Sequence, residues 1–189
     1  MPSSKAWQRE FHVFFIYITD KGFNSLGVAN ALAFDSMSLS TVNTVDILTK
    51  VTKSVVIHSY SFTPALEHTL KQCLTLGKHT NLLHFHSDSV TYYLWAHRDY
   101  QPWGKKLPLQ CPNCGILNPW ASTTMKDGYI LNCKNLKCGE GDSKAVGRFA
   151  FQVLRPVDSI MIPTGRESGG AASGWLKLQN TKMYDNTLF

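Results

Sequence analysis

Runs of apolar residues, separated by polar turns, mark out the first half of the chain. Phe11–Thr19 and Ser54–His58 are rich in aromatic and β-branched residues, and short continuous apolar runs of this kind are typical of strands buried on both faces. Asn81–His86 and Val90–His97 predict two further strands. The pattern therefore favours a sheet in this half of the chain.

Helical spacing predicts the elements between these strands. Apolar side chains recur three or four residues apart over Thr63–Thr75, with Thr63 expected as the N-cap and Pro64 at the first helical position. A shorter helix is expected over Thr44–Val51, and a loop or helical turn over Ser25–Phe34. Strand, helix and strand in this order favour an α/β or α+β layer.

Composition changes after residue 97 and suggests how the chain is divided. Two prolines and a glycine make a helix unfavourable in 98–110 (RDYQPWGKKLPLQ). We expect an α/β domain at 1–97, a linker at 98–110, a cysteine-containing domain at 111–156 and a tail at 157–189. Glycines after Thr164 predict a partly flexible tail in which Trp175 and Leu176 dock on the remainder of the chain.

Four of the five cysteines form the strongest chemical signal. Cys111 and Cys114 are separated by two residues, and Cys133 and Cys138 by four. A C-x-x-C turn aims both sulfurs at one point, and a following glycine allows a left-handed backbone. Two such corners, brought together by a hairpin, predict a tetrahedral four-thiolate site for one structural Zn²⁺.

The segments CPNCG (111–115) and CKNLKCG (133–139) resemble the zinc-ribbon family. The resemblance covers about 40 residues and implies an antiparallel ribbon; the second corner departs from the family, where two residues usually separate the cysteines. Strands are expected at Ile116–Trp120, Tyr129–Cys133 and Arg148–Leu154, with a hairpin turn at Asp127-Gly128. The fold class is thus α+β, with an N-terminal α/β layer before the ribbon.

Other uses of the cysteines stay open at this point. Iron also accepts four thiolates, two disulfides could join the same residues, and a C-x-x-C pair can be redox-active. A catalytic zinc would need an open coordination position, which four thiolates do not leave. No apolar run reaches the roughly 20 residues of a membrane-spanning helix, and the N-terminus lacks secretory-signal features, so we expect an intracellular protein with reduced thiols.

The charge of the middle segment suggests an alternative function. Residues 98–148 hold eight basic and four acidic residues, with Trp103, Trp120 and Tyr129 among them. Cations contact phosphates and aromatic rings stack on bases, so this mixture suits nucleic acid. Lysines would equally offset the charge of a thiolate site. The candidate nucleic-acid contacts are Lys105, Lys106, Lys126, Lys134, Lys137 and Arg148.

A second resemblance concerns the first half of the chain. Its strand, glycine turn and strand resemble the start of caspase-like cysteine peptidases, in which a His-Gly and a nucleophilic Cys follow successive strands. Here those places hold Thr19–Gly22 and His58–Ser61, so the resemblance implies a non-catalytic relative. Tyr100, Trp103-Gly104 and the CPNC segment also resemble uncharacterised fungal proteins that pair an α/β region with a cysteine box.

The favoured hypothesis is an intracellular zinc-binding protein whose ribbon serves as a binding or interaction module. With 43% hydrophobic and 17% charged residues in 189, the chain has globular composition. It lacks the common nucleotide-binding and metalloprotease motifs. Its partner, protein or nucleic acid, is not specified by the sequence.

Overall fold

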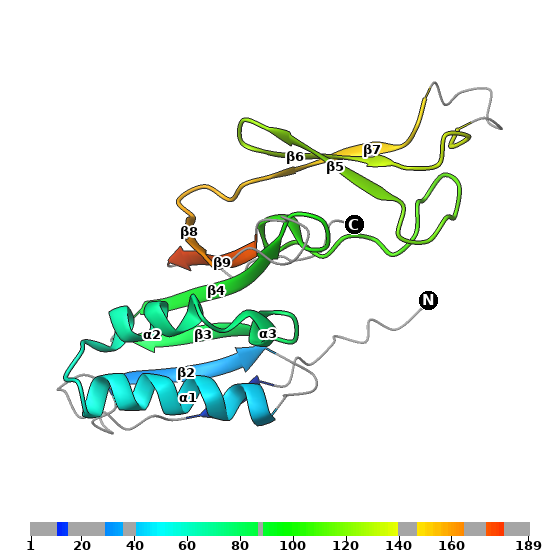
Figure 1. Ribbon diagram of the computed structural model, residues 1–189. Coiled ribbons are helices and arrows are strands. Elements are labelled where there is room, and N and C mark those ends of the chain that lie inside the picture. Colours follow the sequence, from blue (N-terminus) through cyan, green and yellow to red (C-terminus); the bar gives the residue numbers. More distant parts are fainter. Residues whose placement is uncertain are drawn as a thin grey trace, which may run out of the picture.

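The computed structural model describes residues 11–14, 29–35, 41–86, 89–139, 147–164 and 173–179, which build two antiparallel sheets and a few helices (Figure 1). The α+β fold class is therefore confirmed. The resemblance of the first half to caspase-like peptidases stays a prediction.

The larger sheet has six strands in the order β1-β2-β3-β4-β9-β8. Every neighbouring pair is antiparallel. Its strands are β1 (Phe11–Phe14), β2 (Asn30–Asp35), β3 (Asn81–His86), β4 (Ser89–His97), β8 (Ile160–Pro163) and β9 (Ser173–Gln179). The expected strands at 81–86 and 90–97 are confirmed, and Phe11–Phe14 is the described part of the expected strand 11–19.

Three helices pack against one face of this sheet (Figure 1). They are α1 (Thr41–Val56), α2 (Phe62–Leu70) and α3 (Leu74–Gly77). The core between helices and sheet contains fully buried Ile47, Leu66 and Phe34, together with Trp95 and Trp175. Among the described residues, no helix combines the length and the apolar character that a membrane crossing would require.

Two expectations for this half are wrong. Ser54–His58 is not a strand, because α1 continues to Val56 and places Ile57 in an exposed turn. Residues 30–35 form strand β2 rather than a loop or helical turn, with Leu32 and Phe34 facing the helices. In both places packing against neighbouring elements outweighs local propensity.

The expected helix over 63–75 is divided in two. Helix α2 begins at Phe62 after Ser61, so Thr63 is not its N-cap, and the chain leaves helical geometry at Cys73 before α3. Gly77 ends α3 as expected and also lies against Trp95, where a Cβ atom would collide with the indole ring.

The smaller sheet lies between β4 and β8 in the sequence. After β4 comes the short 3-10 helix η1 (Pro102–Gly104), then the three strands in the order β5-β6-β7, and only then β8 and β9. Its strands are β5 (Trp120–Met125), β6 (Gly128–Cys133) and β7 (Ala150–Leu154). The small sheet is thus an insertion in the large one.

The small sheet differs in detail from the expected ribbon. Strand β5 begins only at Trp120, so the expected strand 116–120 is wrong, apart from an isolated bridge between Gln110 and Leu117. Met125 pairs with Gly128, which moves the turn to Lys126-Asp127. The second and third strands are confirmed, and Phe149, Phe151 and Val153 pack in the core of the small sheet.

The segment expected as a partly flexible tail, 157–189, contributes β8 and β9. Trp175 is completely buried, and its Nε1 donates a hydrogen bond to the carbonyl of Leu70 at 3.0 Å. Leu176 is equally buried, which confirms that both residues dock. Strand β9 satisfies the backbone groups along β4, so the large sheet is continuous across the insertion.

Candidate metal centre

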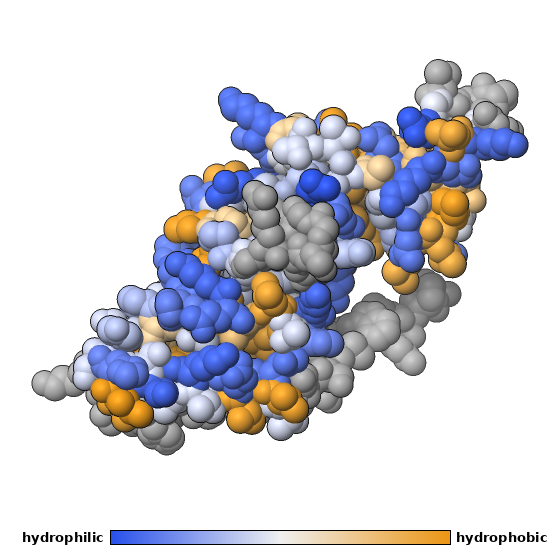
Figure 2. Space-filling view, viewed as in Figure 1, coloured by the Kyte–Doolittle hydropathy of each residue, from blue (hydrophilic) through white to orange (hydrophobic). Residues whose placement is uncertain are grey.

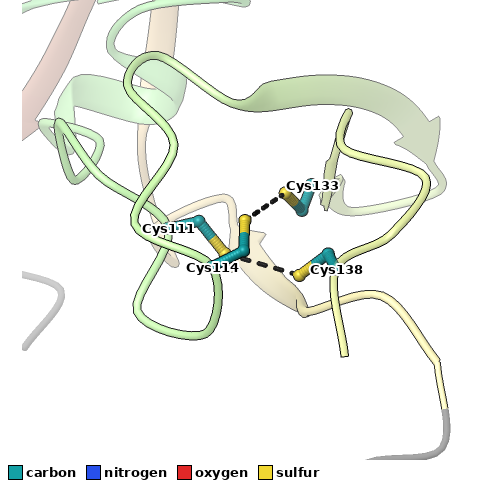
Figure 3. Close-up of side chains that lie close together, drawn as sticks. All are labelled: Cys111, Cys114, Cys133 and Cys138. Atoms are coloured by element: carbon teal, nitrogen blue, oxygen red, sulfur yellow. Dashed lines mark hydrogen bonds between the residues drawn. The ribbon is translucent and has the colours of Figure 1, made fainter. Parts of the chain in front are cut away.

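Two corners of the chain meet at one end of the small sheet and bring four cysteines together (Figure 3). Cys111 and Cys114 come from the loop before β5, Cys133 ends β6, and Cys138 follows it. All four sulfurs lie within 4.8 Å of one another. The four expected ligands therefore converge on a single point.

Backbone hydrogen bonds shape the first corner. The N–H of Gly115 donates to the carbonyl of Cys111 at 2.8 Å, and the N–H of Cys111 donates to the carbonyl of Ile116 at 3.0 Å. Gly115 has φ +68°, and a Cβ atom at this position would meet nothing within 4 Å. The glycine is therefore required by its backbone angle and not by lack of space.

The second corner accommodates its four intervening residues through Asn135. The N–H of Cys138 donates to the backbone carbonyl of Asn135, and the N–H of Lys137 donates to the Asn135 side chain, each at 3.1 Å. Gly139 again has positive φ, +92°. This Asx-type turn draws Cys138 back toward Cys133, and the sequence signal for it is an asparagine two residues after Cys133.

The sulfur positions fit a tetrahedral ion. Metal–sulfur bonds of about 2.3 Å imply sulfur–sulfur separations of about 3.8 Å. Cys111 and Cys138 are 3.7 Å apart, and Cys114 and Cys133 are 3.6 Å apart. All five cysteines of the chain are free thiols, and these separations are far longer than the roughly 2.05 Å of a disulfide. The arrangement could hold one metal ion.

Electrostatic surroundings differ between the thiols. A hydrogen bond from the backbone of Ile116 lowers the pKa of Cys114 to about 6. Burial raises the pKa of the Cys133 thiol to about 12, because a thiolate there would lose its hydration. Without a cation, Cys133 is thus held as a neutral thiol, and a bound metal would supply the positive charge that stabilises its thiolate.

Most of the four-cysteine site is shielded from solvent. Cys111, Cys133 and Cys138 are buried beside Trp120, Leu131 and Val153, and only Cys114 is half-buried. Four thiolates around one ion would complete a tetrahedral shell and leave no position for a substrate. This chemistry is that of a structural metal and not of a catalytic one.

The six basic residues expected to contact nucleic acid do not all gather in one place. Lys134 and Lys137 lie in the second corner, and Arg148 lies just before β7, next to that corner. Lys126 lies in the hairpin turn at the opposite end of β6, about 17 Å away along the strand. Lys105 and Lys106 follow η1.

The two tryptophans of the segment make contacts within the protein, whereas Tyr100 is 75% exposed. Trp120 is buried, makes an edge contact with Phe151, and donates from Nε1 to the carbonyl of Pro108 at 2.7 Å. Trp103 stacks on Tyr129 at 5.6 Å between ring centroids, and the guanidinium of Arg155 lies over the Trp103 ring at 5.4 Å. Arg155 joins the small sheet to the segment after β4, a role that no sequence motif indicated.

Cys73 and the histidines form no second reactive site among the described residues. Cys73 lies in the core, its pKa is raised by burial, and the charged groups near it are Lys50 and Asp46. His84 and His86 share one hydrogen-bond partner, the Oδ1 of Asn30, at 2.8 and 3.1 Å.

Comparison with known proteins finds no relative, so the interpretation of the four-cysteine site rests on its geometry. No protein-family model, no curated protein and no solved structure matches this chain.

Proposed function

We propose that the chain is a zinc-binding protein in which Cys111, Cys114, Cys133 and Cys138 hold one structural Zn²⁺. The observation that carries the proposal is the convergence of four free sulfurs within 4.8 Å, with two pairs at tetrahedral spacing. Zinc is preferred over iron because it is the common ion of structural four-cysteine sites, and its reduced ligands suit an intracellular compartment.

The small sheet, by this proposal, is a zinc-ribbon-like binding module. The buried part of its core consists of Trp120, Leu131 and Val153 together with three metal-ligand cysteines, which is too little apolar surface to stabilise three strands. Bound zinc contributes on the order of 10 kcal/mol in small modules of this type. The module is inserted between strands of a larger sheet. By this proposal, the end of the module that lies away from that sheet binds a partner.

Metal analysis of the purified full chain tests the zinc site. We expect one zinc per chain, reduced to less than about a tenth in Cys133→Ser and in Cys138→Ser, because loss of one thiolate opens the shell. Cys73→Ala is the matched control, since Cys73 is buried outside the cluster, and it should keep its zinc. Iron in place of zinc, or equal metal in all variants, would refute the proposal.

Nucleic-acid binding is the second candidate, supported by charge. Between Tyr100 and Gly139 the sequence has five lysines and a single acidic residue, Asp127. Binding through phosphates would weaken steeply with added salt. A titration of a single strand of about 20 nucleotides at about 50 and 200 mM salt tests it, and absent or salt-independent binding would reject it.

A further inference from the structure

A stripe of exposed β-branched side chains runs along helix α1. Its five members follow one another at intervals of three, four, three and four residues, and they are Val42, Val45, Thr49, Thr52 and Val56. Residues three and four apart lie on the same face of a helix, so these side chains share one face, which we call the α1 stripe. Its valines are 80%, 54% and 66% exposed, and its threonines are exposed as well.

The core of the protein does not explain the α1 stripe. The buried residues of α1 are Thr44, Ile47 and Val51, which lie on another face of the helix. β-branched residues are weaker helix formers than alanine, lysine or glutamate, so they are a poor choice for positions that only face solvent. Figure 2 shows apolar surface near both ends of α1, which Figure 1 places at the lower left of the same view. The stripe is therefore suited to a contact that covers it.

The spacing of the α1 stripe suits a second helix. Intervals that alternate between three and four residues are the pattern by which one α-helix packs along another. The stripe contains no charged side chain, and α1 has 16 residues, which is a length of about 24 Å. Helix α3 contacts α1 on a different side, where the Oγ1 of Thr75 donates to the Oδ1 of Asn43 at 3.2 Å. A helix along the stripe would therefore not compete with α3.

The charges beside the stripe complement one another. In the sequence 36–66 the residues charged at pH 7 are Asp46, Lys50 and Lys53, two lysines and one aspartate, and a net charge of +1 favours neither a strongly acidic nor a strongly basic partner. Asp46 and Lys53 are seven residues, about two helical turns, apart, so they flank the stripe on the same side. Lys50 pairs with Asp46 in the same helix at 2.8 Å, whereas Lys53 has no ion pair among the described residues.

We propose that two copies of the chain associate through antiparallel α1 helices, with a two-fold axis near Thr49. This arrangement sets Val42 of one copy beside Val56 of the other, at both ends of the stripe. It also sets Asp46 beside Lys53 of the other copy, at two symmetric places. A parallel pair would instead place each of these charged residues level with its own counterpart and would gain no ion pair. The inference uses none of the cysteines, so it stands apart from the proposed zinc site.

Sedimentation velocity of the full chain between about 1 and 100 μM tests the inference. Thr49→Glu places like charges next to each other at the two-fold axis, and glutamate is a better helix former than threonine, so α1 should still form. Thr123→Glu is the matched control, because Thr123 is exposed in β5, outside the α1 stripe. Circular dichroism of every variant checks that the helices are retained.

Charge reversal tests the antiparallel arrangement. Asp46→Lys and Lys53→Asp should each weaken the dimer, because each sets like charges beside one another across the interface. The double variant Asp46→Lys/Lys53→Asp restores opposite charges at both places and should recover the dimer. Recovery is expected only for antiparallel helices, since a parallel pair does not bring the two positions together.

The expected result is a concentration-dependent dimer. Its Kd should rise about tenfold or more in Thr49→Glu and in both single charge variants, return to within about threefold of wild type in the double variant, and stay unchanged in Thr123→Glu. A dimer that Thr49→Glu does not weaken more than Thr123→Glu, or a double variant no tighter than the single ones, would overturn the inference. So would a wild-type chain that stays monomeric at about 100 μM, whether another protein or a segment of the same chain then covers the stripe.

Discussion

At the scale of single residues, His84 shows how burial controls charge. The ring is almost completely buried, contacts Phe62 at 4.9 Å between ring centroids, and lies within hydrogen-bond distance of Asn30. Burial lowers the pKa of His84 to about 4, and the charges of His86 and Lys177 act in the same direction. The histidine is therefore neutral in the folded protein at pH 7.

This pKa shift predicts that acid destabilises the fold. Below pH 6.5 the unfolded chain binds a proton that the folded chain does not accept until about pH 4. The stability contributed by neutral His84 is present above pH 6.5 and is lost as the pH falls to about 4, by at most about 3 kcal/mol. Urea unfolding between pH 7 and pH 4 measures this loss.

The variant His84→Gln separates this effect from other acid-sensitive groups. The glutamine side chain cannot bind the proton, so the difference in stability between variant and wild type should shrink as the pH falls. His68→Gln, at a histidine whose ring contacts exposed Gln72, is the control and should follow wild type. A constant difference between His84→Gln and wild type would contradict the prediction.

Gly115 permits a second prediction at this scale. Its φ of +68° suits glycine and asparagine but is costly for β-branched residues, while space for a side chain is open. Gly115→Asn should retain zinc, whereas Gly115→Val should lose about 1–2 kcal/mol of metal-binding free energy. Competition with a chromophoric chelator measures both affinities, and equal affinities would show that the backbone angle is not decisive.

At the scale of elements, the small sheet and the large sheet have different sources of stability. The large sheet has a wide apolar core under α1 and α2, including Trp95 and Trp175. The small sheet has the four-cysteine site and a few side chains around Trp120. The two should therefore respond differently to loss of metal.

Chelation should unfold the small sheet selectively. On removal of zinc from the full chain, amide hydrogens in β5, β6 and β7 should lose most of their protection against exchange, while those in β3 and β4 keep theirs. Hydrogen exchange read by mass spectrometry, before and after chelation, gives the comparison. Cys133→Ser should show the chelated pattern without chelator. Uniform loss of protection in both sheets would instead indicate one cooperative unit.

At the scale of the whole molecule, the insertion couples distant parts of the chain. Strand β9 pairs with β4 along its length, and Lys177 of β9 forms a 2.6 Å ion pair with Glu67 of α2. Asp99 after β4 accepts a hydrogen bond from Ser122 of β5 at 2.9 Å. The sheet formed by the first 97 residues is thus completed by β8 and β9, which follow the insertion in the sequence.

This topology predicts which fragments fold. Residues 1–97 alone should not form a cooperative domain, because β4 would lose its partner strand and Trp175 would leave the core. Replacing residues 105–156 by a Gly/Ser linker should preserve the large sheet. Circular dichroism and urea unfolding of the two proteins give the comparison. A cooperative transition for 1–97 would refute the dependence on β9.

Local chemistry in the sequence identified the four cysteines that converge, because their spacing and the glycines that follow Cys114 and Cys138 favour tight corners that bring sulfurs together. Apolar runs likewise determined β3 and β4. These features depend on neighbours within a few residues, which a sequence records directly.

Only the tertiary structure decided the features that depend on distant contacts. Residues 54–56 became the end of helix α1 because Val51 and Val55 pack on the core, and Asn30–Asp35 became strand because β3 pairs with it. Spacing along the chain also cannot tell whether Trp103 and Trp120 face solvent or core, or that the last strand lies beside β4. Such choices are set by free energies of burial summed over the folded molecule.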